Sequence, residues 1–146
     1  MILPSTKIFA LCTCVLSLQM LILAAMTAAR RAKVNQYLNP EDKAVAFKDA
    51  RCVDGPEHPD VARIIRAHRN MLESIPLFFG LGIVYLLVDA SYRAAPILFG
   101  VFTVARLVHS FVYLREMQPW RTIAYGVASL SLVGMMGMIL RTVLRH

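Results

Sequence analysis

Residues 63–88, RIIRAHRNMLESIPLFFGLGIVYLLV, place a dense group of charged side chains directly before an apolar run. The first part, 63–74, contains three arginines, a histidine, an asparagine and a glutamate, whereas 76–88 contains no charged residue. The apolar part is typical of a membrane-spanning helix. The question is what the charged part of this helix faces, because charged side chains that continue into a membrane span need protein, water or lipid headgroups around them.

The composition of the whole chain favours a membrane protein. The chain has 146 residues, enough for one domain. It is 58% hydrophobic and only 17% charged, whereas a soluble domain carries about a quarter charged residues. The formal net charge of +7 does not indicate a nucleic-acid partner, because no basic stripe is interleaved with aromatic residues. Cysteines 12, 14 and 52 lack metal-site spacing, so they are interpreted as small apolar residues, and no metal is expected.

Four apolar segments predict an all-α, integral membrane four-helix bundle formed by a single domain, residues 1–146. The first segment is uncharged over 22 residues, which is too long for a cleaved signal peptide and long enough to cross a core of about 30 Å. A polar loop at about 34–60 follows it, with a short helix expected around 41–47. The predicted spans are about 8–29, 61–88, 94–114 and 120–140.

The distribution of basic residues predicts the orientation of the bundle. With four spans, both termini lie on one side. The loops after the first and third spans, with the helix ends next to them, hold eleven Lys and Arg residues, whereas the other side holds four. The positive-inside bias therefore places these two loops in the cytoplasm.

One face of the second span is polar. Arg66, Asn70 and Glu73 follow Arg63 in steps of three, four and three, so all four share a helical face. Arginines near a helix end can reach lipid phosphates, which suits Arg63. A glutamate at the depth of Glu73 would be costly beside lipid, so it is expected to face protein or a wet cavity.

Arg106 of the third span is the expected partner of Glu73. Counted from the outer boundary, the two residues lie at depths of roughly 18 and 22 Å at 1.5 Å per residue. Antiparallel neighbouring helices would bring them together as a buried ion pair. The pair could be purely structural, or it could also border a ligand site.

Further polar residues extend this face toward the cytoplasmic end. They follow Arg106 at helical spacing and continue at the start of the fourth span. Such a lining suits a small polyanionic ligand with an amino group for the glutamate to hold, and an apolar second substrate would arrive from the bilayer. The residues are His109, Ser110, Tyr113, Arg121 and Tyr125.

Four motifs resemble those of the MAPEG family, the membrane-associated proteins of eicosanoid and glutathione metabolism. They are NPED at 39–42, RAHRNMLE at 66–73, ARLVHSFVY at 105–113 and PWRTIAY at 119–125. The resemblance covers about residues 31–125. It is strongest to the branch that holds microsomal prostaglandin E synthase type one and microsomal glutathione transferase type one.

The resemblance implies a homotrimer that holds glutathione between adjacent subunits near the cytoplasmic face. Arg121 would stabilise the thiolate, Thr122 stands where the prostaglandin synthase has a serine, and Asp42 matches an acid proposed to assist catalysis. Arg31 would reach in from the neighbouring first span, and His68 would border the glycine end of the tripeptide. The remaining implied binding residues, with two arginines of the same polar face, are Arg66, Arg69, Asn70, Glu73, Arg106, His109, Tyr113, Arg121 and Tyr125.

The chain departs from the branch at Met71, where an aspartate is usual, at Thr122, and in a turn after the third span that is one residue shorter. The resemblance implies a glutathione-dependent transferase that acts on lipophilic electrophiles or lipid peroxides. A prostaglandin-H to prostaglandin-E isomerase and a non-catalytic lipid-binding member are the alternatives. A transporter is disfavoured, because no pair of broken helices marks a midplane site. The expected membrane is the endoplasmic reticulum in a eukaryote or the inner membrane in a bacterium.

Overall fold

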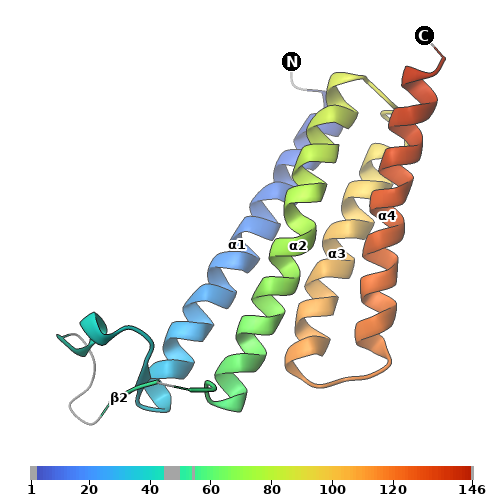
Figure 1. The fold of residues 1–146 in the computed structure, drawn as a ribbon. Helices are drawn as coiled ribbons and strands as arrows, with labels where there is room; N and C mark the ends of the chain where they lie inside the picture. The colour runs from blue at the N-terminus through green and yellow to red at the C-terminus, as the bar shows by residue number, and fades with distance from the viewer. Residues whose placement is uncertain (1–2, 45–49, 54, 146) are drawn as a thin grey trace.

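The computed structural model describes residues 3–44, 50–53 and 55–145. Four helices lie side by side and run almost the full length of the molecule (Figure 1). Each is long and apolar enough to cross a membrane, which confirms the predicted all-α four-helix membrane bundle. The helices are α1 (Pro4–Lys33), α2 (Pro59–Leu87), α3 (Ala95–Leu114) and α4 (Trp120–Val143).

The outer helices run past the apolar segments from which they were predicted. Helix α1 begins at Pro4 and ends at Lys33, so it includes the basic residues after the apolar run. Helix α4 continues to Val143, beyond Arg141. A charged residue ends the hydrocarbon crossing but does not end a helix, because a helix can continue through the headgroup region. Proline is tolerated at the start of α1, since the N–H that it lacks has no partner within the helix there.

The connection between α1 and α2 contains little regular structure. Strand β1 (Gln36–Tyr37) pairs in parallel with β2 (Arg51–Cys52). Between them, the 3₁₀ helix η1 (Pro40–Ala44) occupies the start of the segment where a short helix was expected. Residues 45–47 of that expected helix lie outside the described residues. Figure 1 shows the described part of this connection, which includes η1, beyond the end of α1 and away from α3 and α4.

Helices α2 and α3 each end in a hydrogen-bonded turn of the same type. At the end of α3, the N–H groups of Glu116 and Met117 donate to the carbonyls of Tyr113 and Val112. The end of α2 repeats this pattern around Asp89. Both Asp89 (φ 47°) and Glu116 (φ 61°) have left-handed backbone conformations, which such a turn requires after the last helical residue. These turns send each following helix back antiparallel to the one before it.

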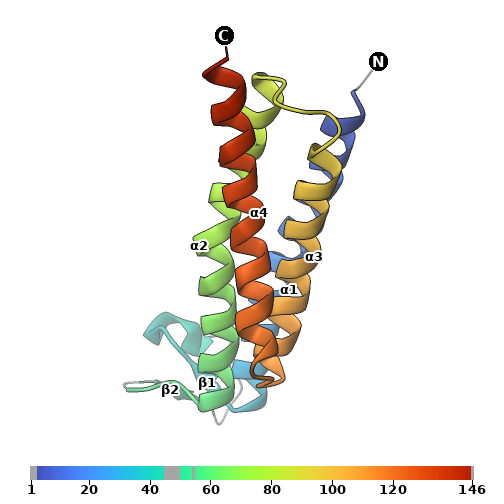
Figure 2. The same cartoon turned by 90° about the vertical axis from the view of Figure 1, so that its right-hand side faces the viewer.

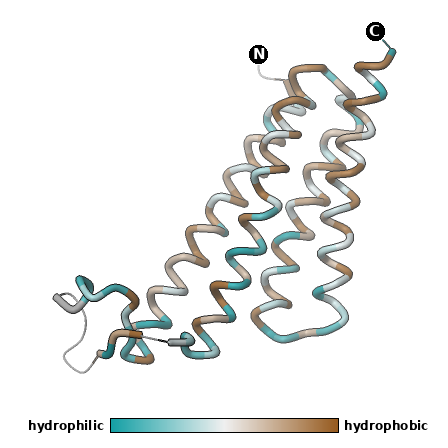
Figure 3. The backbone as a smooth tube through the Cα atoms, viewed as in Figure 1, coloured by the Kyte–Doolittle hydropathy of each residue, from teal (hydrophilic) through white to brown (hydrophobic). Residues whose placement is uncertain are grey.

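The two ends of the bundle differ in polarity. Both termini lie at one end, and the α1–α2 connection and the α3–α4 turn lie at the other (Figures 1 and 2). The end with the α1–α2 connection and the α3–α4 turn is called the loop end. Hydrophilic residues gather there and extend along α2 and α3 (Figure 3). Nearer the termini, Phe78 stacks on Phe102 at 4.5 Å between ring centroids and packs edge-on against Phe99. The aromatic half forms the apolar core, whereas the polar half holds most of the predicted site residues.

Candidate functional site

A cavity of about 340 Å³ lies between α2, α3 and α4 in the polar half of the bundle. It forms there because α2 begins, α3 ends and α4 begins at the same end of the molecule (Figure 2). All six of its lining residues were predicted as site residues from the sequence. They are Asn70 from α2, His109 and Tyr113 from α3, and Arg121, Thr122 and Tyr125 from α4.

Arg121 lies in the first turn of α4, and its neighbours hold its guanidinium beside the cavity. The guanidinium carbon lies 4.9 Å from the centre of the Tyr113 ring. With the Gln118 amide oriented to satisfy its neighbours, its oxygen accepts hydrogen bonds from Nη2 (2.7 Å) and Nε (3.1 Å) of Arg121. The amide nitrogen then donates to Oγ1 of Thr122 at 3.3 Å. These contacts fix a permanent cation next to several hydroxyl groups.

His109 forms a buried wall of the same cavity. Its ring lies 5.7 Å from that of Tyr113 and 6.1 Å from that of Tyr125, between centroids. Its Nδ1 has no hydrogen-bond partner among the described residues, although the side chain is only 2% exposed. A buried polar atom without a partner costs roughly 1–3 kcal/mol, so this nitrogen is available to a ligand.

Arg106 is fully buried, and its partner is Asn70. Its Nη2 donates to the backbone carbonyl of Asn70 at 2.7 Å and to Oδ1 of the same residue at 2.9 Å. No ion pair joins Arg106 to Glu73 in the part of the chain that the structure describes, and Glu73 is exposed. The predicted buried pair is therefore wrong. Asn70 lies one helical turn from Glu73 and offers two oxygen atoms to the same guanidinium.

Glu73 and Arg106 nevertheless line the same cavity, a second one of about 230 Å³. It adjoins the first cavity, because Asn70 and Tyr125 line both. Nε and Nη1 of Arg106 have no hydrogen-bond partner among the described residues. A carboxylate and a partly unsatisfied guanidinium can together bind a group that carries both an amine and a carboxylate.

A third cavity, of about 250 Å³, lies at the loop end and shares Tyr113 and Arg121 with the first. Arg66, a predicted site residue, lines it, and so does Arg63. An ion pair between Arg63 and Glu116 joins the start of α2 to the α3–α4 turn. Sequence reasoning missed two residues of this turn: Glu116, which pairs with Arg63, and Gln118, which accepts from the predicted site residue Arg121. Their only signal was their position within the three residues before the PWRTIAY motif.

Four predicted site residues do not line these cavities within one chain. Arg31 donates from Nε to Oε1 of Glu57 at 3.0 Å, in the segment just before α2. Asp42 lies on η1, where its carboxylate accepts a hydrogen bond from the backbone N–H of Asn39. The other two, on α2, are His68, which is half-buried, and Arg69, which is exposed.

The arrangement is suited to binding an anion. Arginines 63, 66, 106 and 121 surround the connected cavities, and Tyr113, Tyr125 and Thr122 add hydroxyl groups. Among the described residues, no cluster of three or more His, Cys, Asp or Glu side chains could hold a metal ion. Arg121 and the hydroxyl groups beside it line one cavity, where together they can stabilise a negative charge on a bound ligand.

Comparisons with known proteins show the family of the chain. The family model described as "MAPEG family" matches residues 9–141. Prostaglandin E synthase of Homo sapiens is 34% identical over 148 residues, covering 98% of this chain and 93% of that protein. Prostaglandin E synthase of Mus musculus is 36% identical over 139 residues, covering 94% and 89%. Microsomal glutathione S-transferase 1 of Rattus norvegicus is 35% identical over 111 residues, covering 75% and 72%.

Proposed function

Because this chain belongs to the MAPEG family, we propose that it is a glutathione-dependent integral membrane enzyme. It transfers the glutathione thiolate to lipophilic electrophiles, or uses glutathione to reduce lipid peroxides. The observation that carries this proposal is the position of Arg121. Its guanidinium borders a cavity whose wall also holds Thr122 and Tyr125.

The charges of glutathione match those of the connected cavities. At neutral pH the tripeptide carries two carboxylates, one ammonium group and a thiol. Among the described residues, Glu73 is the only carboxylate that lines the second cavity, so it is assigned the ammonium group. One carboxylate is assigned to Arg106, which lines the same cavity as Glu73, and the other to the arginines of α2, because a guanidinium pairs with a carboxylate through two parallel hydrogen bonds. Arg121 then remains for the sulfur.

Arg121 favours the reactive form of the thiol. A thiol with a pKa near about 8.5 is only a few per cent ionised at neutral pH, and the thiolate is the nucleophile. Lowering that pKa by about two units requires roughly 2.7 kcal/mol of preference for the anion. One charge-assisted hydrogen bond in a partly dry site is of this order. The hydroxyls of Tyr125 and Thr122 are further donors to the same anion.

The active assembly is proposed to be a homotrimer. Within one chain, Arg31 and Asp42 lie away from the cavities, and Arg69 and Glu73 are exposed at the depth of the membrane. Charged groups at that depth require protein or water around them. The first span of a neighbouring subunit would cover this face and bring its own Arg31. The positive-inside bias places the active site toward the cytoplasm, in the endoplasmic reticulum of a eukaryote or the inner membrane of a bacterium.

A prostaglandin-H to prostaglandin-E isomerase is the second candidate. It is favoured by the relatives named prostaglandin E synthase, which cover nearly the whole chain. The two activities differ in what happens to glutathione, because an isomerisation regenerates it and a transfer consumes it. A non-catalytic lipid-binding protein would need neither Arg121 nor the hydroxyls beside it.

The deciding experiment combines binding with three reactions in one detergent preparation. Calorimetry measures glutathione binding. Conjugation of 1-chloro-2,4-dinitrobenzene, reduction of a lipid hydroperoxide and isomerisation of a prostaglandin endoperoxide are then followed with wild type and Arg121→Leu. Arg141→Leu is the matched control, because it removes the same side chain at the opposite end of α4. A protein that does not bind glutathione, or that binds it without any of these reactions, would refute the proposal.

A further inference from the structure

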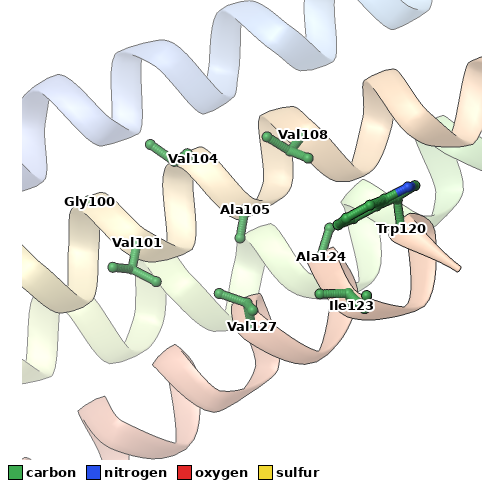
Figure 4. A pocket seen from close by; sticks show the side chains of 9 residues that line it. All are labelled: Gly100, Val101, Val104, Ala105, Val108, Trp120, Ile123, Ala124 and Val127. Carbon is green, nitrogen blue, oxygen red and sulfur yellow. The ribbon is translucent and has the colours of Figure 1, made fainter.

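An apolar groove runs between α3 and α4 on the outside of the bundle. Its volume is about 420 Å³, within the range of roughly 300–1,000 Å³ that ligand pockets occupy. Figure 4 shows valine side chains of α3 facing Trp120 and Ile123 of α4 across it. Val104 and Trp120 are exposed by 59% and 57%. The groove therefore faces the surroundings of the bundle and is not part of its packed core.

This groove does not belong to the proposed glutathione site. On α4, the side chains that line the groove include Trp120, Ile123 and Val127. Those that line the polar cavity are Arg121, Thr122 and Tyr125. At 100° per residue these two sets point to nearly opposite sides of the helix. An electrophile in the groove would be separated from the sulfur by α4 itself, so another kind of occupant is needed.

The apolar stripe of α3 leads to a cation at the membrane boundary. Val101, Val104, Val108, Phe111 and Arg115 follow one another in steps of three, four, three and four, so they lie on one side of the helix. Arg115 directly follows the last residue of α3, and its guanidinium carbon lies 5.4 Å from the centre of the Phe111 ring. No carboxylate among the described residues forms an ion pair with it.

The opposite wall of the groove ends in Trp120, the first residue of α4. Tryptophan is enriched at this boundary because its ring is apolar and its Nε1–H is polar. From Gly100 to Val108 the groove extends about 12 Å along α3, most of the roughly 15 Å of hydrocarbon in one leaflet. The dimensions match an acyl chain. On α3 the lining ends at Val108, and Arg115 lies about 10 Å further along the helix, so a cation follows the end of the groove at the distance of a headgroup, and Trp120 adds a hydrogen-bond donor.

We propose that this groove binds one acyl chain of an anionic phospholipid, whose phosphate lies between Arg115 and Trp120. The lipid comes from the leaflet on the loop side. The positive-inside bias assigns that side to the cytoplasm, where membranes carry anionic lipids. One surface arginine contributes about 1 kcal/mol of attraction to such lipids, which corresponds to about fivefold in relative affinity.

Trp120 is the only tryptophan in the chain, so its fluorescence reports on this groove alone. The full-length protein is reconstituted in vesicles of equal surface charge that contain a fixed fraction of brominated lipid. The bromine is carried on the chains of either phosphatidylglycerol or phosphatidylcholine. We expect brominated phosphatidylglycerol to quench Trp120 with about fivefold preference over brominated phosphatidylcholine. Arg115→Gln is expected to remove the preference, and Arg51→Gln, an exposed arginine of β2, is expected to keep it.

A second variant tests occupancy of the groove. Val104→Phe fills its exposed wall without enlarging a buried residue, and it is expected to lower the quenching by both brominated lipids. Equal quenching by the two lipids in wild type would overturn the proposal, because the contact would then be unselective. Absence of quenching by either would also overturn it, since protein would then cover the groove. A preference that survives Arg115→Gln would place the phosphate elsewhere. Glutathione binding, measured on the same vesicles, reports on the other site separately.

Discussion

The buried contact between Arg106 and Asn70 gives the sharpest test of the polar half of the bundle. Nη2 of Arg106, which is 0% exposed, donates to two oxygens of Asn70 at 2.7 and 2.9 Å. A hydrogen bond to a charged group contributes roughly 1.5–3 kcal/mol. Asn70→Ala removes only the Oδ1 acceptor, so it is expected to lower stability by about that amount. For a chain of this size, the loss corresponds to a decrease of about 5–10 °C in melting temperature.

A double-mutant cycle isolates this contact from other effects of the substitutions. The measurement is the thermal midpoint of detergent-solubilised protein at a fixed scan rate, because membrane proteins often unfold irreversibly. Arg106→Met and Asn70→Ala are combined, and the expected coupling free energy is about 1.5–3 kcal/mol. In a parallel cycle, Glu73→Gln replaces Asn70→Ala and is expected to give less than about 1 kcal/mol, because no ion pair joins Glu73 to Arg106.

The comparison of the two cycles decides between the two partners. Additive effects of Asn70→Ala and Arg106→Met, within about 0.5 kcal/mol, would refute the assignment of Asn70. A larger coupling in the Glu73 cycle would restore the ion pair that helix depth predicts. If both cycles gave large couplings, the three side chains would form one network, and Arg106 would not depend on a single acceptor.

Three further predictions concern the proposed active site. Arg121→Leu should strongly reduce turnover per bound glutathione and abolish the ultraviolet absorbance of the thiolate, while glutathione affinity falls much less. If affinity were lost and turnover per bound glutathione were unchanged, Arg121 would instead bind a carboxylate of glutathione. Glu116→Gln, which breaks the ion pair to Arg63 at the loop-end cavity, should raise the association rate of glutathione about 1.5- to 5-fold at low salt. Stopped-flow measurements with Glu41→Gln as the control, an exposed acid on η1, check this, and equal effects of both substitutions would contradict it. Native mass spectrometry should give a trimer, and a fully active monomer would rule that assembly out.

The sequence contained enough to predict the helices and most of the cavity. Apolar runs with charged ends define the spans, because each must satisfy its backbone within the hydrocarbon. Helical spacing then assigns Asn70, His109 and Tyr125 to faces, and antiparallel order brings those faces together at one end. All six residues that line the cavity beside Arg121 follow from these two rules and the family motifs.

What could not be predicted depends on distances shorter than a helical turn. Depth along a helix was estimated from residue counts, but Asn70 and Glu73 are only about 4.5 Å apart along α2. A side chain as long as that of Arg106 can reach either of them, so the counts cannot choose the acceptor. The roles of Glu116 and Gln118 depend on the conformation of a turn, and helical periodicity carries no information about turns.

Several buried nitrogen and oxygen atoms in the polar half of the bundle have no hydrogen-bond partner, although they lie at the depth of the membrane. Among the described residues, Nδ1 of His109, Nε and Nη1 of Arg106, and Oε1 of Gln19 have no hydrogen-bond partner. Gln19 lies near the middle of α1, and its Nε2 donates to the backbone carbonyl of Arg106 at 3.3 Å. In a membrane such groups destabilise the protein unless something else satisfies them. The stacked aromatic residues nearer the termini stabilise the fold without them, so these groups of α3 remain free for a ligand or water. In the polar half the same side chains therefore serve both purposes, because Arg106 stabilises the bundle through Asn70 and still has two N–H groups to offer a ligand.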